Sequence, residues 1–324
     1  MTNLYDIATA IRRSESILIC GHIMPDGDCL GSVLALGLSL EAMGKKVVMA
    51  GPDPIPAIYE FLPGVERFKT GAPPDGVYDT FIILDCSVPE RLGRDYQELL
   101  TTKKVVINID HHAGPGILGP YCYIDTAAAA VGEIVFDLLK LMQVRISVET
   151  AINLYTAIVT DTGSFRYDSV TPGTHRRIAE LLESGAPGAQ INILLHEEKP
   201  KAALVLLREA LHTLTVAPCG KVCWMTVTLE MLKNTGALDE HTEGLVTYCR
   251  SIRGVEVGLL FREILEDTYK VSLRSKNIVD VNTLAVQFGG GGHPKAAGCI
   301  LKGALREIQD KVTRAAVLAA GGTA

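Results

Sequence analysis

The chain has 324 residues, of which 48% are hydrophobic and 21% charged, and its net charge is −6. This length is enough for about two domains with large apolar cores, so stability requires neither disulfides nor a structural metal. The acidic balance argues against a protein that holds a long nucleic acid, because such proteins need many Lys and Arg side chains to neutralise phosphates.

The cysteines and the amino-terminal residues indicate the compartment. The eight cysteines are scattered and form no C-x-x-C pair, which is typical of reduced, buried thiols in the cytosol. The first residues contain no apolar core of a signal peptide, and no run of about 18 apolar residues could span a bilayer. We therefore expect a cytoplasmic protein that has no membrane partner.

Short, β-branched apolar runs alternate with helical patterns in the first half of the chain. The runs predict buried strands at Ser16–Cys20, Lys46–Ala50, Thr80–Leu84 and Lys104–Ile109. The helical patterns lie at Cys29–Met43, Pro89–Leu100, Thr126–Met142, Val148–Thr160 and Pro172–Ser184. This alternation predicts an α/β fold whose N-terminal sheet is mostly parallel and carries helices on both faces.

A turn-rich, charged stretch at residues 186–200 predicts a linker between a domain at 1–185 and a second domain at 201–324. The second half of the chain also contains both apolar runs typical of strands and helical patterns. We expect strands at Val222–Thr228, Val255–Ile264 and Tyr269–Ser275. We expect helices at Ala202–Leu214, at Val281–Phe288 and from about Leu305. This part therefore reads as a smaller C-terminal α/β domain.

Acidic and histidine residues follow the ends of several predicted strands. Those that come directly after a strand are His22, Asp26, Asp28, Asp85, Asp110, His111 and His112. The carboxyl ends of parallel strands line one crevice, so we expect these side chains to gather there. Asp161 ends an apolar helix, where a carboxylate is unfavourable against the helix dipole unless a cation compensates.

Each of these residues also has a simpler interpretation. Asp26 or Asp28 alone could cap the next helix, and residues 110–112 could form a solvated turn. Together they favour a metal site. Carboxylates combined with imidazoles favour Mn²⁺ or Mg²⁺ over structural zinc, and a shared carboxylate can hold two ions about 3.5–4 Å apart.

The C-terminal half offers two groups of residues suited to anions. The glycine run Gly289–Gly292, followed by His293, allows close approach to a ligand, although a flexible linker is the alternative. Arg262 and Arg274 lie on adjacent predicted strands, where alternation could place both on one surface as phosphate contacts. Ordinary surface arginines remain the alternative.

These motifs resemble the DHH phosphoesterases. The resemblance rests on H-x-x-P-D-G-D-x-x-G-S from His22 to Ser32, Asp85 at its strand end, D-H-H at Asp110–His112 and T-D-T-G at Thr160–Gly163. The tail G-G-G-G-H-x-x-A-A-G, Gly289–Gly298, resembles the DHH-associated C-terminal domain. All occur in the family's order and cover nearly the whole chain. Together they resemble the nanoRNase/pAp phosphatase, or NrnA-like, branch.

The resemblance implies a site for two Mn²⁺ ions, with Mg²⁺ as the alternative. One ion would bind His22, Asp26 and Asp85. The other would bind Asp28, Asp85, His111 and Asp161, so that Asp85 bridges. Catalytic roles would fall to His112, which contacts the phosphate or protonates the leaving group, to the bridging Asp85, and to Asp110, which orients an imidazole.

The resemblance also implies the substrates. The enzyme would be a Mn-dependent phosphodiesterase, an exoribonuclease and a 3′(2′),5′-bisphosphate nucleotidase. A hydroxide activated by two metals would cleave short oligoribonucleotides, linear dinucleotides such as pApA and pGpG, or pAp, and not long nucleic acid. The residues implied to bind substrate are Arg262, Arg274, Ser275, Gly290, Gly291, Gly292 and His293.

Two other functions remain open from the sequence. An inorganic pyrophosphatase of the same superfamily shares the metal motifs, although the glycine-rich tail disfavours it. A nucleotide-binding regulatory module without turnover is the other alternative. The sequence leaves a monomer and a homodimer both open.

Overall fold

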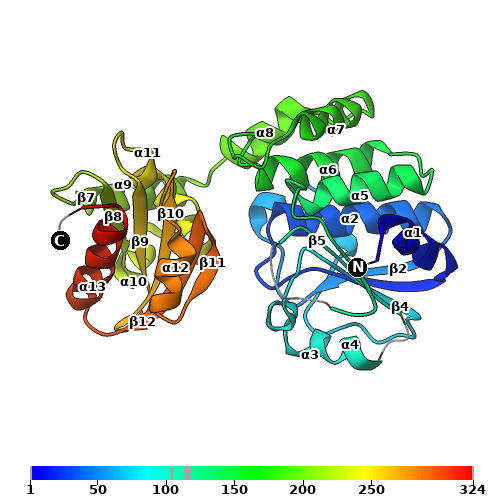
Figure 1. Ribbon diagram of the computed structural model, residues 1–324, viewed down its shortest axis with the longest axis horizontal. Helices are drawn as coiled ribbons and strands as arrows, with labels where there is room; N and C mark the ends of the chain where they lie inside the picture. Colours follow the sequence, from blue (N-terminus) through cyan, green and yellow to red (C-terminus); the bar gives the residue numbers. More distant parts are fainter. Residues whose placement is uncertain (1, 103–104, 113–117, 323–324) are drawn as a thin grey trace. The chain divides into compact units, whose positions relative to one another are not determined.

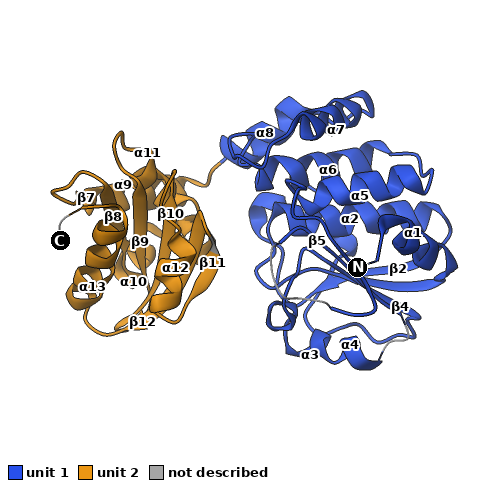
Figure 2. Ribbon diagram, viewed as in Figure 1, with its two compact units in different colours: residues 1–198 blue, residues 199–324 orange. Residues whose placement is uncertain are grey.

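The computed structural model describes residues 2–102, 105–112 and 118–322. The chain forms two compact units, Met1–Glu198 and Lys199–Ala324 (Figure 2). Each unit has its own six-stranded sheet and its own apolar cores. Among the described residues, no helix is long and apolar enough to cross a membrane.

The sheet of the first unit is parallel throughout. Its strands are β1 Ser16–Cys20, β2 Lys46–Gly51, β3 Lys69–Thr70, β4 Thr80–Leu84, β5 Val105–Asp110 and β6 Tyr121–Ile124. Their order is β3-β2-β1-β4-β5-β6. Alternate residues of β1 enter opposite cores, with Ile17 and Ile19 on one face and Leu18 and Cys20 on the other. Burial on both faces explains why the strands read as continuous apolar runs, and the predicted parallel sheet is confirmed.

Helices cover both faces of this sheet (Figure 1). One face carries α1 Leu4–Arg13, α2 Gly27–Ala42, α5 Val131–Leu141 and α6 Val148–Asp161, with α7 Pro172–Glu183 and α8 Gly188–His196 beyond them. The other face carries α3 Arg94–Gln97 and α4 Leu99–Thr102. The long helices on the first face hold the larger of the two cores.

Three predicted segments differ in the structure. The helix expected at Pro89–Leu100 is broken, because Gly93 has a φ of 79° between a 3₁₀ turn, η3 Pro89–Leu92, and α3. The helix expected from Thr126 begins only at Val131, since Ala130 is still extended. The predicted linker 186–200 contains α8, which forms because Ile191 and Leu195, one helical turn apart, are buried in the first unit's core.

The order of the strands places the candidate site. β1 pairs with β2 on one side and with β4 on the other, so the chain winds in opposite directions from this point. A crevice opens at the carboxyl ends of two strands where the winding reverses in this way. The loop that carries His22 follows β1, and Asp85 follows β4. The topology therefore brings these two segments together although about 60 residues separate them.

The second unit has a mixed sheet in the order β11-β12-β10-β9-β8-β7, in which only β8 and β9 of the described strands pair in parallel. Its strands are β7 Thr215–Val216, β8 Val222–Val227, β9 Val257–Leu265, β10 Thr268–Ser275, β11 Gly291–His293 and β12 Ala296–Lys302. Its helices are α9 Lys201–His212, α10 Leu229–Thr235, α11 Leu245–Ser251, α12 Val281–Gln287 and α13 Leu305–Ala319. The helices α12 and α13 cover one face, and α9 to α11 cover part of the other.

Glu256 fastens the segment that joins β10 to α12. Its buried carboxylate accepts hydrogen bonds from the backbone amides of Asn277, Ile278 and Val279 at 2.9, 2.7 and 3.0 Å. Burial raises the pKa of Glu256, but these amides outweigh burial and hold the pKa below its ordinary value. The charged form is therefore the one that the fold prefers.

We expect Glu256→Gln to destabilise the second unit by about 1–3 kcal/mol at neutral pH, because charge-assisted hydrogen bonds become neutral ones. A lowered folded pKa gives stability that is complete above the ordinary carboxyl pKa and is lost as the pH falls through the folded value. The difference between wild type and variant should therefore shrink in acid. Urea unfolding at several pH values measures it, and a difference independent of pH would contradict this role.

Candidate metal centre

The loop after β1 is held on two sides. The amide of Ile23 donates to the carbonyl oxygen of Arg91 at 2.7 Å, and the amide of Met24, which has a φ of 51°, donates to Asp53 at 2.6 Å. Asp26 then caps α2 by accepting from the amide of Cys29 at 3.0 Å. The helix-cap interpretation is thus correct for Asp26, and its carboxylate still lies beside an imidazole.

The first cluster comprises His22, Asp26 and Asp85. The Nε2 atom of His22 lies 3.8 Å from Asp26 Oδ1 and 3.3 Å from Asp85 Oδ2. The other ring nitrogen, Nδ1, is 2.7 Å from the carbonyl oxygen of Ile23. A ring held at one nitrogen presents the other in a fixed direction, as metal-binding histidines do.

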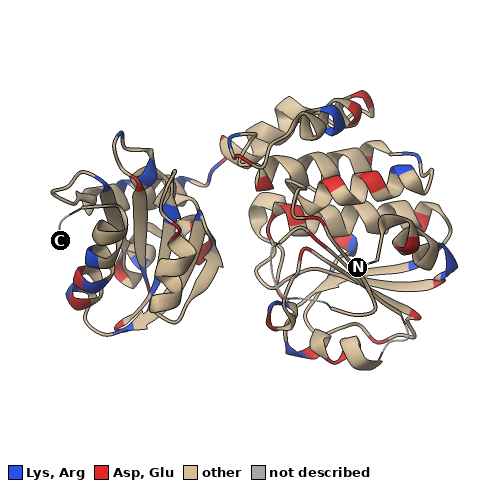
Figure 3. Cartoon of the chain, in the orientation of Figure 1, with Lys and Arg blue, Asp and Glu red and all other residues tan. Residues whose placement is uncertain are grey.

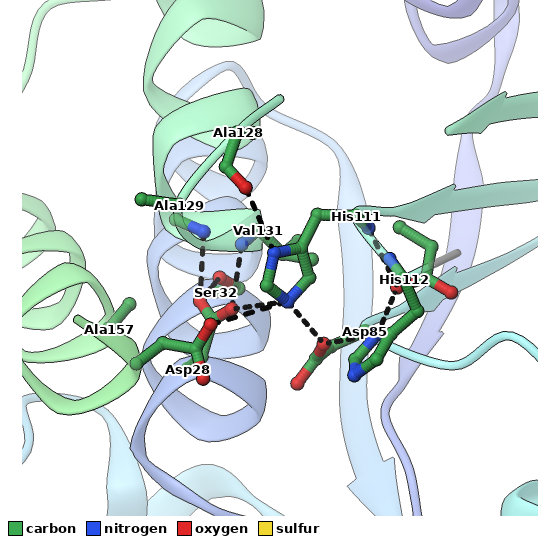
Figure 4. Close-up of polar contacts among 12 residues, drawn as sticks. Asp28, Ser32, Asp85, His111, His112, Ala128, Ala129, Val131 and Ala157 are labelled. Atoms are coloured by element: carbon green, nitrogen blue, oxygen red, sulfur yellow. Dashed lines mark hydrogen bonds and ion pairs between the residues drawn. The ribbon is translucent and has the colours of Figure 1, made fainter. Parts of the chain in front are cut away.

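The second cluster comprises Asp28, His111 and Asp161. The Nε2 atom of His111 lies 3.9 Å from Asp28 Oδ2 and 3.3 Å from Asp161 Oδ2. Its Nδ1 is 3.1 Å from the carbonyl oxygen of Ala128, so this imidazole is also oriented from behind (Figure 4). In each cluster, a backbone carbonyl therefore orients one imidazole, which faces two carboxylates. Asp85 is counted here with the first cluster.

Asp28 is fixed by hydrogen bonds within the fold. Its carboxylate accepts from the amides of Val131 at 2.6 Å and Gly132 at 2.9 Å, and from the hydroxyl of Ser32 at 3.1 Å (Figure 4). The two amides are the first of α5, where unpaired N–H groups favour an anion. These bonds explain why α5 begins later than the sequence pattern predicts.

Asp85 lies between the two clusters. Its Oδ2 faces His22, while its Oδ1 lies 3.7 Å from His111 Nε2 and 3.4 Å from His112 Nδ1. The residue is buried and has a φ of 57°, a conformation that costs most non-glycine residues of order 1–3 kcal/mol. This backbone strain directs one carboxylate toward both groups of ligands.

The adjacent histidines have different surroundings, as the sequence predicts. The fully buried Asp110 accepts from His112 Nδ1 at 2.7 Å through Oδ1, and the same oxygen accepts the amides of His111 and His112. The rings of His111 and His112 meet edge to face, with centroids 4.6 Å apart. His111 therefore joins the second cluster, and His112 pairs with Asp110.

The electrostatics of the clusters call for a cation. Burial and then the charge of Asp85 raise the pKa values of Asp28 and Asp161. Within the described residues, the buried Asp85 Oδ1 and Asp110 Oδ2 accept no hydrogen bond. Oxygen and imidazole donors in this number fit Mn²⁺ or Mg²⁺, and a divalent ion would relieve the repulsion among the carboxylates.

In the second unit, the structure brings Arg262 and Arg274 to one face of the sheet, in agreement with the predicted alternation. Arg262 pairs across the strands with Lys270, and Arg274 lies four residues further along β10. Sequence reasoning missed Lys270, although the same alternation places it with them. Burial and then the charge of Arg262 lower the pKa of Lys270. Like charges opposite each other destabilise a sheet, so this row suits an anion.

Ser275 is not part of this face. It is buried on the opposite side of β10, where its hydroxyl donates to the carbonyl oxygen of Val279 at 2.7 Å and to that of Pro294 at 3.3 Å. Its partners hold the segment before α12 against the segment after β11. Ser272 is the serine that shares the face of Arg274, because strand residues two apart point the same way.

The glycine run forms an ordered strand end and not a flexible linker. Gly291 pairs with Gly298, and a Cβ on Gly290 would lie 2.1 Å from the carbonyl oxygen of Gly298. Gly292 has a φ of 148°, and its Cβ would lie 2.5 Å from the carbonyl oxygen of Ala296. The side chain of His293 lies outside the described part of the structure. The glycines therefore allow two strands to approach closely at this edge.

Each of the two units matches a known domain family. Residues 16–159 match the DHH family, N-terminal domain, and residues 224–317 match the DHHA1 domain. The bifunctional oligoribonuclease and PAP phosphatase NrnA of Thermus thermophilus is 33% identical over 96% of this chain and 95% of that protein. The chain belongs to the DHH family. The resemblance stated from the motifs is thereby confirmed.

Solved DHH structures share the fold. An exopolyphosphatase-related protein from Bacteroides fragilis superposes with a TM-score of 0.91 and 26% identity, covering 97% of this chain and 95% of that one. RecJ of Thermus thermophilus, solved in complex with Mn²⁺, has a TM-score of 0.53 and 14% identity, covering 97% of this chain and 54% of its own. The α/β architecture expected from the sequence is that of these DHH proteins.

Proposed function

We propose that this DHH protein hydrolyses phosphate esters of very short nucleotides to mononucleotides. The substrates are oligoribonucleotides of a few residues, linear dinucleotides such as pApA and pGpG, and pAp. The observation that carries the proposal is the position of Asp85 between two ligand clusters, which suits a pair of ions acting on one phosphoryl group. The oligoribonuclease and PAP phosphatase from Thermus thermophilus supports this substrate class.

Two Mn²⁺ ions, with Mg²⁺ as the alternative, would activate water and neutralise charge on the phosphoryl group when bound. His22, Asp26 and Asp85 would hold one ion. The ligands of the other would be Asp28, Asp85, His111 and Asp161. The distances within each cluster support these assignments, as does the buried Asp85 Oδ1, which accepts no hydrogen bond from the described residues.

In the hydrolysis, the oxygen of water forms a bond to phosphorus while the bond from phosphorus to the ribose oxygen breaks. The electron pair of that bond goes to the leaving oxygen, which also takes up a proton. We assign His112 to contact the phosphate or to supply this proton, because Asp110 holds its ring at 2.7 Å beside Asp85. Burial lowers the pKa of His112, but Asp110 and Asp85 outweigh it and raise the pKa above its ordinary value.

The sheet of the second unit supplies recognition. Arg262, Lys270 and Arg274 would bind a phosphate of the substrate away from the bond that breaks, with the glycine strand Gly290–Gly292 and His293 beside a nucleotide. Basic positions lie among acidic ones in both units (Figure 3). This distribution and the net charge of −6 favour short ligands over long nucleic acid.

We expect Arg262→Ala to raise KM for pApA about 10- to 100-fold and to leave kcat nearly unchanged, because the lost contact is made equally in the ground and transition states. His293→Ala should act in the same direction. Arg208→Ala is the matched control, since Arg208 is exposed and pairs with its neighbour Glu209. Unchanged kinetics for Arg262→Ala would remove this residue from the substrate site.

One experiment tests the proposal. Purified protein with Mn²⁺ is given pAp, pApA, pGpG, a five-nucleotide RNA and pyrophosphate, and kcat/KM is compared. Preference for the short nucleotides supports the proposal. Preference for pyrophosphate would instead identify a pyrophosphatase. Tight binding of pAp without any product would identify a regulatory module.

A further inference from the structure

A short turn of the second unit, η4 Asp239–Thr242, contacts the guanidinium of Arg262. The Nη1 atom of Arg262 donates to the carbonyl oxygen of Asp239 at 3.4 Å and to the hydroxyl oxygen of Thr242 at 3.3 Å. The same nitrogen lies 3.5 Å from Oδ2 of the Asp239 side chain. Arg262 is one of the cations proposed to bind a substrate phosphate, so this turn lies beside the proposed recognition site.

The turn holds these acceptors in a fixed arrangement. The hydroxyl of the buried Thr242 donates to the carbonyl oxygen of Asp239 at 2.7 Å. Because a hydroxyl carries one proton, the Thr242 oxygen can then only accept from Arg262. The amide of Leu238 donates to His241 Nδ1 at 3.0 Å, which closes the start of the turn. The fold therefore sets where the oxygens that face Arg262 lie.

Contact at one nitrogen leaves the rest of the guanidinium available. The three contacts that Arg262 makes with described residues all use Nη1. Nη2 and Nε lie along another edge of the planar group, and such a pair of donors matches two oxygens of a phosphate. The side chain is only 16% exposed, so a guanidinium held at Nη1 keeps its orientation. Thr242 thus fixes the plane in which Arg262 offers the pair.

The carboxylate of Asp239 has the opposite effect on an anion. Its side chain is 71% open to water, and exposed ion pairs contribute little to stability. Its negative charge nevertheless lies next to Arg262, which pairs across the strands with Lys270. A phosphate that binds these two cations comes close to the carboxylate and is repelled by it. Asp239 therefore weakens the attraction that the two cations provide.

We propose that η4 tunes the affinity of the recognition site through two residues with opposite effects. Thr242 is a positioning residue that orients Arg262 toward a phosphate of the substrate. Asp239 is a competing anion that limits how tightly this phosphate binds. The inference rests on the proposed function, which assigns the phosphate to Arg262. Because that phosphate lies away from the bond that breaks, both residues change KM and leave kcat nearly unchanged.

The first test removes the hydroxyl of Thr242 in the full chain. With Mn²⁺ and pApA, we expect Thr242→Val to raise KM about 3- to 10-fold, because Arg262 loses a charge-assisted hydrogen bond. Thr242→Ser keeps the hydroxyl and should recover most of the affinity. Thr226→Val is the matched control. Thr226 is as buried as Thr242, at 6%, but its hydroxyl accepts from Gln309 of α13, which covers the opposite face of the sheet.

The second test removes the charge of Asp239. Asp239→Asn keeps the backbone carbonyl that Arg262 contacts, and we expect it to lower KM for pApA about 2- to 5-fold at low salt. The difference from wild type should shrink as NaCl is added, because salt screens exposed charges. Asp310→Asn is the matched control, since it removes the same charge from the exposed surface of α13.

Two further measurements separate positioning from a general loss of structure. In an Arg262→Ala background, Thr242→Val should no longer change KM, because the guanidinium that Thr242 orients is absent. Thermal melting of Thr242→Val and Thr226→Val compares their stabilities. Similar melting temperatures with a raised KM only in Thr242→Val would support positioning.

Each role has outcomes that would overturn it. The role of Thr242 would be lost if its Val variant had the KM of Thr226→Val, if kcat fell with the affinity, or if Thr242→Ser recovered nothing. An unchanged or higher KM for Asp239→Asn would refute the competing role. A wild-type protein that hydrolyses none of the short nucleotides would overturn the proposed function together with this inference. Wild-type turnover with an unchanged KM in both variants would overturn only the role of η4.

Discussion

Asp85→Ala is expected to lower kcat on pApA by about 10³-fold or more, because it removes the one carboxylate that both ligand clusters share. Loss of Asp26 or Asp28 would leave one cluster complete, whereas loss of Asp85 affects both. The number of Mn²⁺ ions bound per chain should fall in the same variant. Steady-state kinetics and calorimetry measure the two effects.

The fold should survive this change. Within the described residues, Asp85 Oδ1 accepts no hydrogen bond, and removing the carboxylate relieves repulsion on Asp28 and Asp161. Alanine at a φ of 57° costs about 1–2 kcal/mol, which partly offsets that relief. Thermal melting should therefore change little, as it should for Asp95→Ala on the exposed surface of α3. Full turnover by Asp85→Ala would refute the two-ion assignment.

Asp110→Asn is expected to lower kcat about 10²- to 10³-fold while Mn²⁺ binding remains. An amide oxygen can still accept the backbone amides of His111 and His112, but the side chain loses the charge that holds His112 Nδ1 at 2.7 Å. The imidazole then loses its preferred tautomer and orientation. Single-turnover rates at saturating pApA measure the loss in the chemical step.

Asp95→Asn serves as the control for this change, since it also replaces a carboxylate by an amide, but at the exposed surface. A purely structural role for Asp110 would lower Mn²⁺ affinity and thermal stability together with kcat. Equal kcat for Asp110→Asn and wild type would show that His112 needs no carboxylate partner.

The sequence predicted the parts of the fold that local patterns determine. Strands buried on both faces read as apolar runs whatever they pair with, so β1, β2 and β4 were found at nearly their observed bounds. The loops that carry His22 and Asp85 were found because each follows such a strand directly. The resemblance to DHH phosphoesterases then supplied the proposed division of the ligands between two ions, which spacing alone does not give.

The sequence-based predictions were wrong where contacts between distant parts of the chain determine the local structure. Alternation along β10 groups Ser272 with Arg274 and separates both from Ser275, but it does not say which group faces the core. Ser275 was consequently placed with the wrong neighbours. The late start of α5 depends on the contact of its first amides with Asp28.

Asp28 and Asp26 differ in how far each carboxylate is enclosed by the fold. Asp28 is held rigidly by the first amides of α5, whereas more than half of the Asp26 side chain, 54%, is open to water. A cation bound beside Asp28 would be shielded from water, whereas a cation bound beside Asp26 would exchange its ligands with solvent more readily. The two positions should thus fill in succession, and dilution or a chelator should empty the outer one first.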